Sequence, residues 1–226
     1  MSDTIQDLNR PRAFPPVVLG LLVANGAIYL LQGAWGYVLE SNFALWPLGG
    51  PFALRTNGGI ITGEFHVWQL LTHSFLHGSS LHLFSNLFAL WMFGMRIENL
   101  WGSARFLRFY VICVLSAALL QLLVTSVGVQ MESMPPVPTV GASGGVFGIL
   151  LAFGMMFPNE RVVLLIPPIP MPAKVFVTLY GLFELFAGVT GSLSGIAHFA
   201  HLGGMIGGFL TIQYWRGRWP FGGGYR

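Results

Sequence analysis

The sequence predicts an all-α membrane protein built around a bundle of six transmembrane helices. Three observations favour this fold class. Hydrophobic residues make up 54% of the 226 positions and charged residues only 8%, whereas about a quarter of the residues in a soluble domain are charged. Long apolar runs recur along the chain, separated by segments rich in Gly, Pro and charged residues. Most Lys and Arg residues fall in alternate loops, which is the bias that orients membrane helices.

The first span is expected over 16–39, because no charged residue lies between Arg12 and Glu40 and roughly 20 apolar residues cross a bilayer core. This run is too long for the apolar part of a signal peptide, so we expect a retained span. Further spans are expected over 81–97, 106–127, 143–157, 173–189 and 197–214. Residues 41–80 are rich in Gly, Pro and aromatics, which predicts a long first loop with short helices lying partly in the membrane surface.

Six spans place both chain ends on one side of the membrane. Every Lys and Arg except Arg55 falls on that side, so both termini are expected in the cytoplasm. The predicted organisation is a cytoplasmic segment over 1–15, a six-span domain over 16–214 and a flexible cytoplasmic tail over 215–226. The formal charge of +3 therefore reports topology, and no nucleic-acid partner is expected. A single cysteine, Cys113, rules out an intrachain disulfide.

A serine between glycines is the first candidate functional residue. Ser143 lies in Gly141-Ala142-Ser143-Gly144, where a Pro-rich loop becomes an apolar helical run. The first N–H groups of a helix lack partners within it and carry partial positive charge, so this position suits a nucleophile beside an oxyanion pocket. Small residues are also common where membrane helices pack, so the pattern alone also fits a packing role.

Polar residues recur near the starts of the other two spans that begin on the outer face. His82 and Asn86 lie at i and i+4 and share one face of the second span. Asn86 is about five residues into that span, or roughly 7 Å deep at 1.5 Å per residue. His198 and His201 lie in the first turn of the sixth span. These residues fall at similar shallow depths, which favours a functional role, because polar groups inside a bilayer are costly.

Glycine spacing predicts which helices touch. Gly144 with Gly148, and Gly204 with Gly208, have the spacing that lets membrane helices approach closely. His201 lies on the same stripe as Gly204 and Gly208, so we expect its imidazole to reach Ser143.

The other histidines and Glu184 have less specific interpretations. His66, His73 and His77 are expected to order the first loop near the membrane surface. Glu184 lies within the fifth span, where it either faces a wet cavity or a helix contact, or tunes the site.

Together these motifs resemble those of the rhomboid intramembrane serine proteases. Residues 141–144 resemble the family's nucleophile motif, Ala200-His201-Leu202-Gly203-Gly204 its histidine motif, and His82-Leu83-Phe84-Ser85-Asn86 its second-helix motif. The similarity includes 68–73 and 75–78 and covers about 68–209. Two positions depart from the common pattern, since Gln69 follows Trp68 where many members have Arg, and Phe147 stands where some have Tyr.

The resemblance implies a six-helix bacterial-type protease in which Ser143 is the nucleophile and His201 its base. Asn86, His82 and the backbone N–H of Ser143 would contact the oxyanion, and the ring of Phe147 would pack on His201. The supporting residues would be Gly141, Gly144, Phe147, His198, Gly204 and Gly208. The acids expected on the outer side, Glu40, Glu64 and Glu132, lie in loops, so we predict a Ser-His dyad without a carboxylate.

The expected partners are single-pass membrane proteins and the lipid bilayer, with the oligomeric state left open, in a bacterial inner membrane. No cofactor or metal is expected. A helical substrate hydrogen-bonds its own amides, so it must unwind to be cut, which favours Gly, Pro or small residues near the outer surface. Water is expected to enter from that side, under the Gly191–Gly195 loop.

Two other functions remain open at this point. A metal or proton transporter could use the six histidines, although no His-Glu-x-x-His pair or acidic ligand cluster is expected beside them. Such a protein should bind added zinc tightly, whereas a fluorophosphonate should label Ser143 only in a serine hydrolase. A non-catalytic relative could bind membrane helices, but the presence of both Ser143 and His201 argues against it. That binder would keep its activity after Ser143→Ala.

Overall fold

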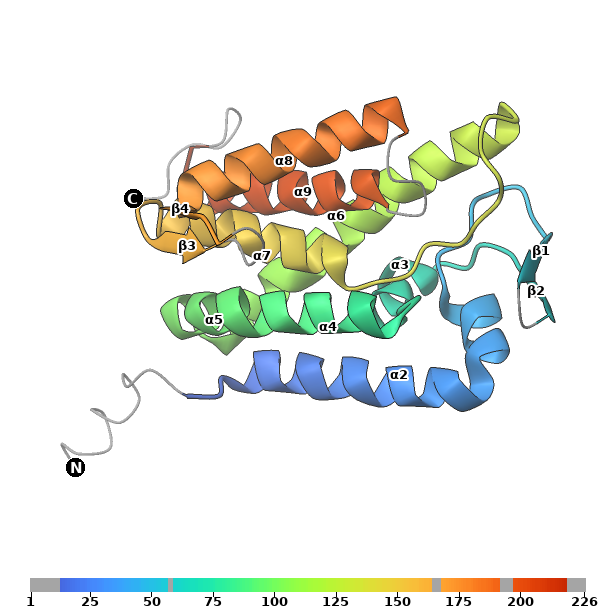
Figure 1. The fold of residues 1–226 in the computed structure, drawn as a ribbon, viewed down its shortest axis with the longest axis horizontal. Coiled ribbons are helices and arrows are strands. Elements are labelled where there is room, and N and C mark those ends of the chain that lie inside the picture. The colour runs from blue at the N-terminus through green and yellow to red at the C-terminus, as the bar shows by residue number, and fades with distance from the viewer. Residues whose placement is uncertain (1–12, 57–58, 164–167, 192–196, 219–226) are drawn as a thin grey trace.

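The computed structural model describes residues 13–56, 59–163, 168–191 and 197–218, which form a helical bundle with two short β-hairpins (Figure 1). The helices are α2 (Pro16–Phe43), α3 (Gln69–Thr72), η2 (His73–Phe75), α4 (Ser80–Ala89), η3 (Leu90–Gly94), α5 (Met95–Trp101), α6 (Ser103–Gln130), α7 (Ser143–Met156), α8 (Ala173–Thr190) and α9 (His198–Trp215). The strands are β1 (Phe52–Thr56), β2 (Gly59–Gly63), β3 (Arg161–Val163) and β4 (Pro170–Pro172).

Each predicted span coincides with helix in the structure. The second span is a continuous run of α4, η3 and α5, and the others correspond to α2, α6, α7, α8 and α9. Among the described residues, α2, α6 and α8 are long and apolar enough to cross a membrane, and α7 is a shorter apolar helix. The protein is therefore an integral multi-pass membrane protein. The predictions for 1–12, 192–196 and 219–226 lie outside the described residues.

The exposed side chains of α8 indicate whether this helix faces water or lipid. Its large apolar side chains are exposed, with Leu182 59%, Phe186 64% and Val189 72% accessible, whereas Glu184 on the same helix is 3% accessible. A soluble helix would have the reverse arrangement. The pattern is that of a helix facing lipid, with its ionisable group turned toward the bundle interior.

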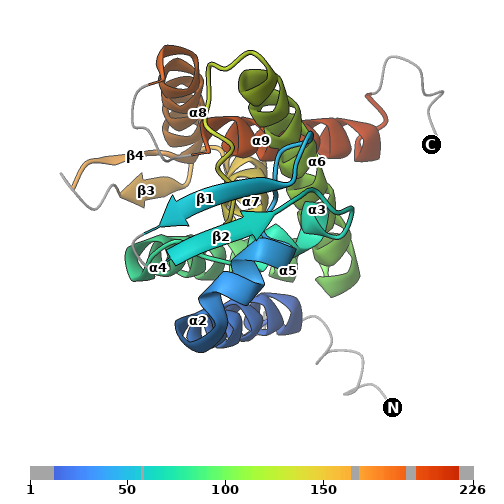
Figure 2. The same ribbon diagram turned by 90° about the vertical axis from the view of Figure 1, so that its right-hand side faces the viewer.

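The order of the helices across the bundle follows from their contacts. In Figure 1, α2 lies along one edge and α8 along the other, with α4, α7 and α9 between them. The long helix α6 packs against both α7 and α9. The hairpin of β1 and β2 lies at one end of the bundle and that of β3 and β4 at the other (Figures 1 and 2).

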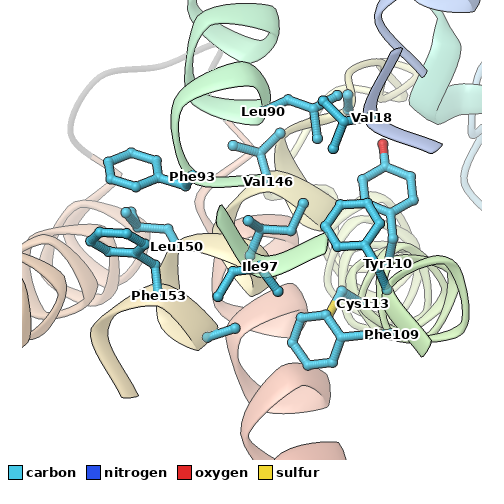
Figure 3. Close-up of a cluster of buried hydrophobic side chains, with 14 of the residues drawn as sticks. Val18, Leu90, Phe93, Ile97, Phe109, Tyr110, Cys113, Val146, Leu150 and Phe153 are labelled. Carbon is cyan, nitrogen blue, oxygen red and sulfur yellow. The ribbon is translucent and has the colours of Figure 1, made fainter. Parts of the chain in front are cut away.

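A buried cluster joins the first half of the chain to α7. Val146, Leu150 and Phe153 form one stripe of α7, and the ring of Phe153 packs edge-on against Phe93 with centroids 4.9 Å apart. Figure 3 shows this cluster, which also includes Ile97 of α5 and residues of α2 and α6. The contacts fix the rotation of α7, so its remaining face points toward α9.

Two helix starts are secured by side chains. The buried carboxylate of Glu98 accepts hydrogen bonds from the backbone N–H groups of Val17 at 3.0 Å and Val18 at 2.8 Å. These are N–H groups that the first turn of α2 cannot satisfy itself. At α4, the hydroxyl of Ser79 accepts from the backbone N–H of His82 at 3.1 Å, which is an ordinary N-cap.

The first loop differs from its prediction. Two short helical turns, α3 and η2, are present as expected, but β1 and β2 also form an antiparallel hairpin with Phe52 opposite Gly63 and Arg55 opposite Ile60. The description all-α therefore omits this hairpin and the smaller pair β3 and β4. The β-branched run Ile60-Ile61-Thr62 favours a strand, and Ile61 is buried at 2% exposure.

Candidate active site

The predicted site residues lie on helices that begin at the same end of the bundle. Figure 1 shows α4, α7 and α9 all starting on the side of the β1–β2 hairpin. His82, Ser143 and His201 belong to the first turns of these three helices. Their depths are similar for this reason.

Ser143 and His201 are in direct contact, as expected from the glycine stripes. The Nε2 atom of His201 lies 2.9 Å from the Oγ atom of Ser143, although the two residues are 58 positions apart in the chain. His201 is 8% exposed, and Ser143 is half-buried. A hydroxyl and an imidazole in this geometry can exchange a proton.

Close packing of α7 on α9 produces this contact. A Cβ atom added at Gly204 would collide with the carbonyl oxygen of Gly144, and one at Gly208 would lie 3.4 Å from the Cα of Gly148. A side chain at Gly204 would push α7 and α9 apart, so this glycine sets the distance between Ser143 and His201, whereas the nearest neighbours of Gly208 are Phe109 and Cys113 of α6.

A second glycine stripe on α9 was not identified from the sequence. Added Cβ atoms at Gly203 and Gly207 would collide with the backbone or side chain of Ser116 on α6. The paired glycines at 203–204 and 207–208 were the available signal, because two adjacent stripes indicate two close neighbours. Helix α9 therefore packs closely against α7 on one side and against α6 on the other.

The segment that leads into α7 is fastened to the first loop. The backbone N–H of Gly141 donates to the carbonyl of His73 at 2.9 Å, and Thr139 pairs with Leu45 as an isolated β-bridge. Gly141 has φ +129°, a region that side-chain-bearing residues rarely adopt. An added Cβ there would lie 2.8 Å from the ring of His82, so the imidazole of His82 rests against the backbone beside Ser143.

Asn86 lies one turn further along α4. Its side chain is 5% exposed, and its Nδ2 atom donates to the carbonyl of His82 at 3.0 Å. The ring of Phe147 stacks on His201, with centroids 4.1 Å apart and an angle of 7° between the planes. The flat contact leaves the edge of the imidazole, which carries both nitrogen atoms, free for hydrogen bonding.

The expectation that no carboxylate reaches the imidazole is wrong. The Oε2 atom of Glu184 lies 2.9 Å from Nδ1 of His201 and 2.6 Å from Nδ1 of His198, and all three side chains are buried. Sequence spacing places Glu184 within the fifth span but says nothing about the rotation of that helix against the sixth. The buried charge itself was the signal, because an ionisable group in a membrane helix needs a partner.

The same three residues correct a second expectation. Glu184, His198 and His201 offer ligand atoms that all lie within 4.8 Å of one another, so one carboxylate and two of the six histidines form a group that could hold a metal ion. In the structure these atoms are hydrogen-bonded to each other. The absence of a metal from the reaction remains a prediction.

The first-loop histidines each contact a neighbouring group. His73 is buried, and its Nδ1 lies 2.7 Å from the carbonyl of Gln69. The ring of His66 stacks on Trp68 with centroids 4.4 Å apart. His77 is 2% exposed, and its ring meets that of His82 edge-on at 5.1 Å. Burial lowers the pKa of both His73 and His77 to about 4.

Gln69 follows Trp68 at a position where many rhomboid sequences have Arg. Its side chain links separate segments of the first loop by hydrogen bonds. Its Oε1 accepts from the backbone N–H of Trp46 at 3.2 Å, and its Nε2 donates to the carbonyls of Asn42 at 3.3 Å and Glu64 at 2.9 Å. A neutral amide can donate and accept at once, which an Arg cannot do.

Fold and site together define a membrane-embedded helical bundle with a serine and a histidine in contact. The sequence pattern described as Rhomboid domain matches residues 64–218. The chain is 30% identical over 165 residues to "Rhomboid protease GluP" of Bacillus subtilis (strain 168), covering 71% of this chain and 28% of that protein. It is 30% identical over 160 residues to "Putative rhomboid protease YdcA" of the same organism, covering 70% and 72%.

A further relative is "Rhomboid protease AarA" of Providencia stuartii, 27% identical over 210 residues, covering 88% of this chain and 72% of that protein. The protein belongs to the rhomboid family. The chain spans 28% of the length of GluP and 56% of the length of "Rhomboid protein 1, mitochondrial" of Saccharomyces cerevisiae.

Proposed function

We propose that this protein is an intramembrane serine endopeptidase that cuts membrane-spanning substrates near the outer face. The observation that carries the proposal is the 2.9 Å contact between Ser143 Oγ and His201 Nε2, inside a bundle whose outer surface is apolar. The printed names of GluP and AarA as rhomboid proteases support the same reaction class.

The proton is exchanged within a dyad of Ser143 and His201. As the Oγ atom of Ser143 bonds to the carbonyl carbon of the substrate, its proton moves to Nε2 of His201. The imidazolium then gives that proton to the leaving amine nitrogen as the C–N bond breaks. A water molecule next attacks the acyl-serine, passing a proton to the same Nε2, and that proton returns to Oγ when the acid leaves.

The oxyanion is stabilised by groups around the start of α7. The backbone N–H of Ser143 belongs to the helix N-terminus, where N–H groups lack helical partners. His82, whose ring lies against Gly141, and Asn86, one turn further along α4, supply side-chain donors. Each such donor is worth about 3–4 kcal/mol in the transition state.

The length of α7 supports a recessed position for Ser143. With 14 residues, this helix is about 21 Å long, whereas the hydrocarbon core is about 30 Å thick. Its far end lies beside charged and polar groups typical of a membrane surface, including the ion pair of Arg96 and Glu160 at 2.9 Å. If that end lies at the surface, Ser143 lies about 9 Å below the other face, within reach of water entering from outside.

The remaining assignments are part of the same proposal. The chain forms six spans with 1–15 and 215–226 in the cytoplasm of a bacterial cell, and its substrates are single-pass membrane proteins. These substrates unwind locally at Gly, Pro or small residues before cleavage, because a helical peptide bond is protected by its own hydrogen bonds. No metal takes part, so cleavage should persist in EDTA.

The test is cleavage of a generic single-span substrate in liposomes by the native chain, Ser143→Ala and His201→Ala. Both variants should fold, as judged by thermal unfolding, and both should lose cleavage by at least 10³-fold, in line with losses seen when a nucleophile or base is removed. Cleavage that continues in folded Ser143→Ala would refute the proposal and favour a protein that only binds membrane helices.

A further inference from the structure

We propose that Glu184 and His198 form a positioning network that fixes the tautomer of His201, so that the site works as a Ser-His-Glu assembly. The inference rests on the proposed function, because it assigns a role to residues behind the dyad. It is carried by one carboxylate oxygen, Oε2 of Glu184, which is shared by Nδ1 of His201 at 2.9 Å and Nδ1 of His198 at 2.6 Å.

The chemistry of the shared oxygen determines where the protons are. An ionised carboxylate only accepts hydrogen bonds, so both Nδ1 atoms must carry hydrogen. A neutral imidazole protonated at Nδ1 has its lone pair on Nε2. In His201, that lone pair faces the hydroxyl of Ser143, which therefore donates. The network thus holds His201 in the tautomer that a general base requires.

Helix α8 is shaped to bring this carboxylate to α9. Gly181, Glu184 and Gly188 lie on one face at i, i+3 and i+7. An added Cβ atom at Gly181 would lie 3.0 Å from Met205, and one at Gly188 would lie 3.2 Å from the Cβ of His198. The two glycines permit the close approach, and the carboxylate projects between them toward the histidines.

The presence of a carboxylate at position 184 also argues for a role beyond packing. Burying a carboxylate costs several kcal/mol unless it is well paired, whereas an apolar residue would fill the same space between two membrane helices at no such cost. A second donor from His198 satisfies the oxygen and fixes its position. The other titratable side chains nearby are Tyr180 of α8, which contacts Phe147, and His82 of α4, which adjoins Gly141.

The network acts when the proton moves. Transfer from Ser143 to Nε2 creates an imidazolium whose Nδ1–H already points at a negative oxygen. Glu184 stays ionised and takes no proton, and its charge stabilises the cation until the proton passes to the leaving amine. In serine proteases with an Asp in this position, loss of the charge lowers kcat by about 10⁴-fold. For Glu184, we expect a loss on the order of 10²-fold or more.

The first experiment compares Glu184→Gln with the native chain in liposomes. Gln has nearly the same shape, so the variant should unfold at a similar temperature and keep its KM, while kcat falls by about 10²-fold or more. Glu184→Asp, which restores the charge, should recover part of kcat. A kcat within threefold of the native value in Glu184→Gln would overturn the proposal, and so would loss of native cleavage in EDTA, because a bound metal would then be required.

Glu98→Gln is the matched control. It makes the same change in another buried carboxylate, which caps α2 far along the chain from Ser143. Measured below its unfolding transition, this variant should keep its kcat although it unfolds at a lower temperature. An equal loss of kcat in both variants would assign the effect of Glu184→Gln to general destabilisation and overturn the proposal.

A second readout does not depend on folding of a variant. The ¹⁵N chemical shifts of the histidines in the native protein distinguish the two neutral tautomers. The proposal requires His201 to be protonated at Nδ1 near neutral pH, and a ring protonated only at Nε2 would overturn it. If Ser143→Ala and His201→Ala abolish cleavage while these tests fail, the network is wrong but the proposed function stands. Full cleavage in those two variants would refute the function itself.

Discussion

The imidazole of His201 is held on three sides by side chains from two neighbouring helices, α7 and α8. Ser143 meets Nε2, Glu184 meets Nδ1, and Phe147 covers one flat face. Fixing a ring in this way reduces the reorganisation needed when the proton moves, which is how active sites place reacting atoms within a few tenths of an ångström.

At the residue scale, Phe147 provides a direct test of this support. Phe147→Ala removes a ring that stacks 4.1 Å from the imidazole and is 6% exposed, so the free energy of unfolding should fall by about 3–5 kcal/mol. Its kcat should fall by about tenfold or more because the imidazole gains freedom. Phe147→Tyr keeps the stack and should cleave within about threefold of the native rate. Unchanged kcat in folded Phe147→Ala would contradict the role of the ring.

Single residues also show where sequence reasoning reached its limit. Ser143 and His201 could be paired in advance, because each lies on or beside a glycine stripe that fixes which face of its helix meets the other. Glu184 could not be placed, since the sequence does not say which helix packs against the face of α8 that carries Gly181, Glu184 and Gly188. Its partners became visible only when the packing of α8 on α9 was known.

At the scale of elements, the helix positions were the most predictable feature. Uninterrupted apolar runs bounded by Gly, Pro and charge coincide with α2, α6, α7, α8 and α9. The hairpin of β1 and β2 was missed because its strands are short and lie in a stretch whose aromatics suggested interfacial helices. A π-helical segment, η3, between α4 and α5 also leaves no clear mark in an apolar sequence.

The contact of α7 with α9 can be tested with one methyl group. In Gly204→Ala, the added Cβ collides with the carbonyl of Gly144, so the helices must separate and the Ser143–His201 contact should lengthen. We expect cleavage to fall by at least tenfold and the unfolding temperature to drop. Gly26→Ala in α2 is the matched control, because a Cβ there has nothing within 4 Å, and it should behave like the native chain. Native cleavage by Gly204→Ala would mean that the glycine contact does not set the site geometry.

At the scale of the whole molecule, the two hairpins lie at opposite ends of the bundle and should lie on opposite sides of the membrane (Figure 1). Arg55 of β1 and Arg161 of β3 are both exposed. In a Cys113→Ala background, an impermeant maleimide applied to intact cells should label Arg55→Cys and spare Arg161→Cys. Labelling of Arg161→Cys alone would invert the proposed topology.

Stability should fall in acid because of the first loop. His73 and His77 are buried with pKa values of about 4, below the unfolded value of about 6.5, so the unfolded chain binds more protons. Their contribution is therefore complete above pH 6.5 and is lost as the pH falls toward 4. At pH 5, the loss is on the order of 1–2 kcal/mol for each histidine.

Thermal unfolding in detergent micelles at pH 7 and pH 5 measures this effect. The His73→Gln/His77→Gln variant should show a smaller difference between the two pH values than the native chain does. An equal difference in both proteins would assign the acid sensitivity to other groups.

The most direct measurement is the site of covalent labelling by a fluorophosphonate, read by mass spectrometry of the protein in liposomes. An activated serine should give one adduct, on Ser143, formed at least 10²-fold more slowly in His201→Ala and absent from Ser143→Ala. An unlabelled Ser143 in protein that cleaves its substrate, or equal labelling with and without His201, would contradict the assignment of these two residues.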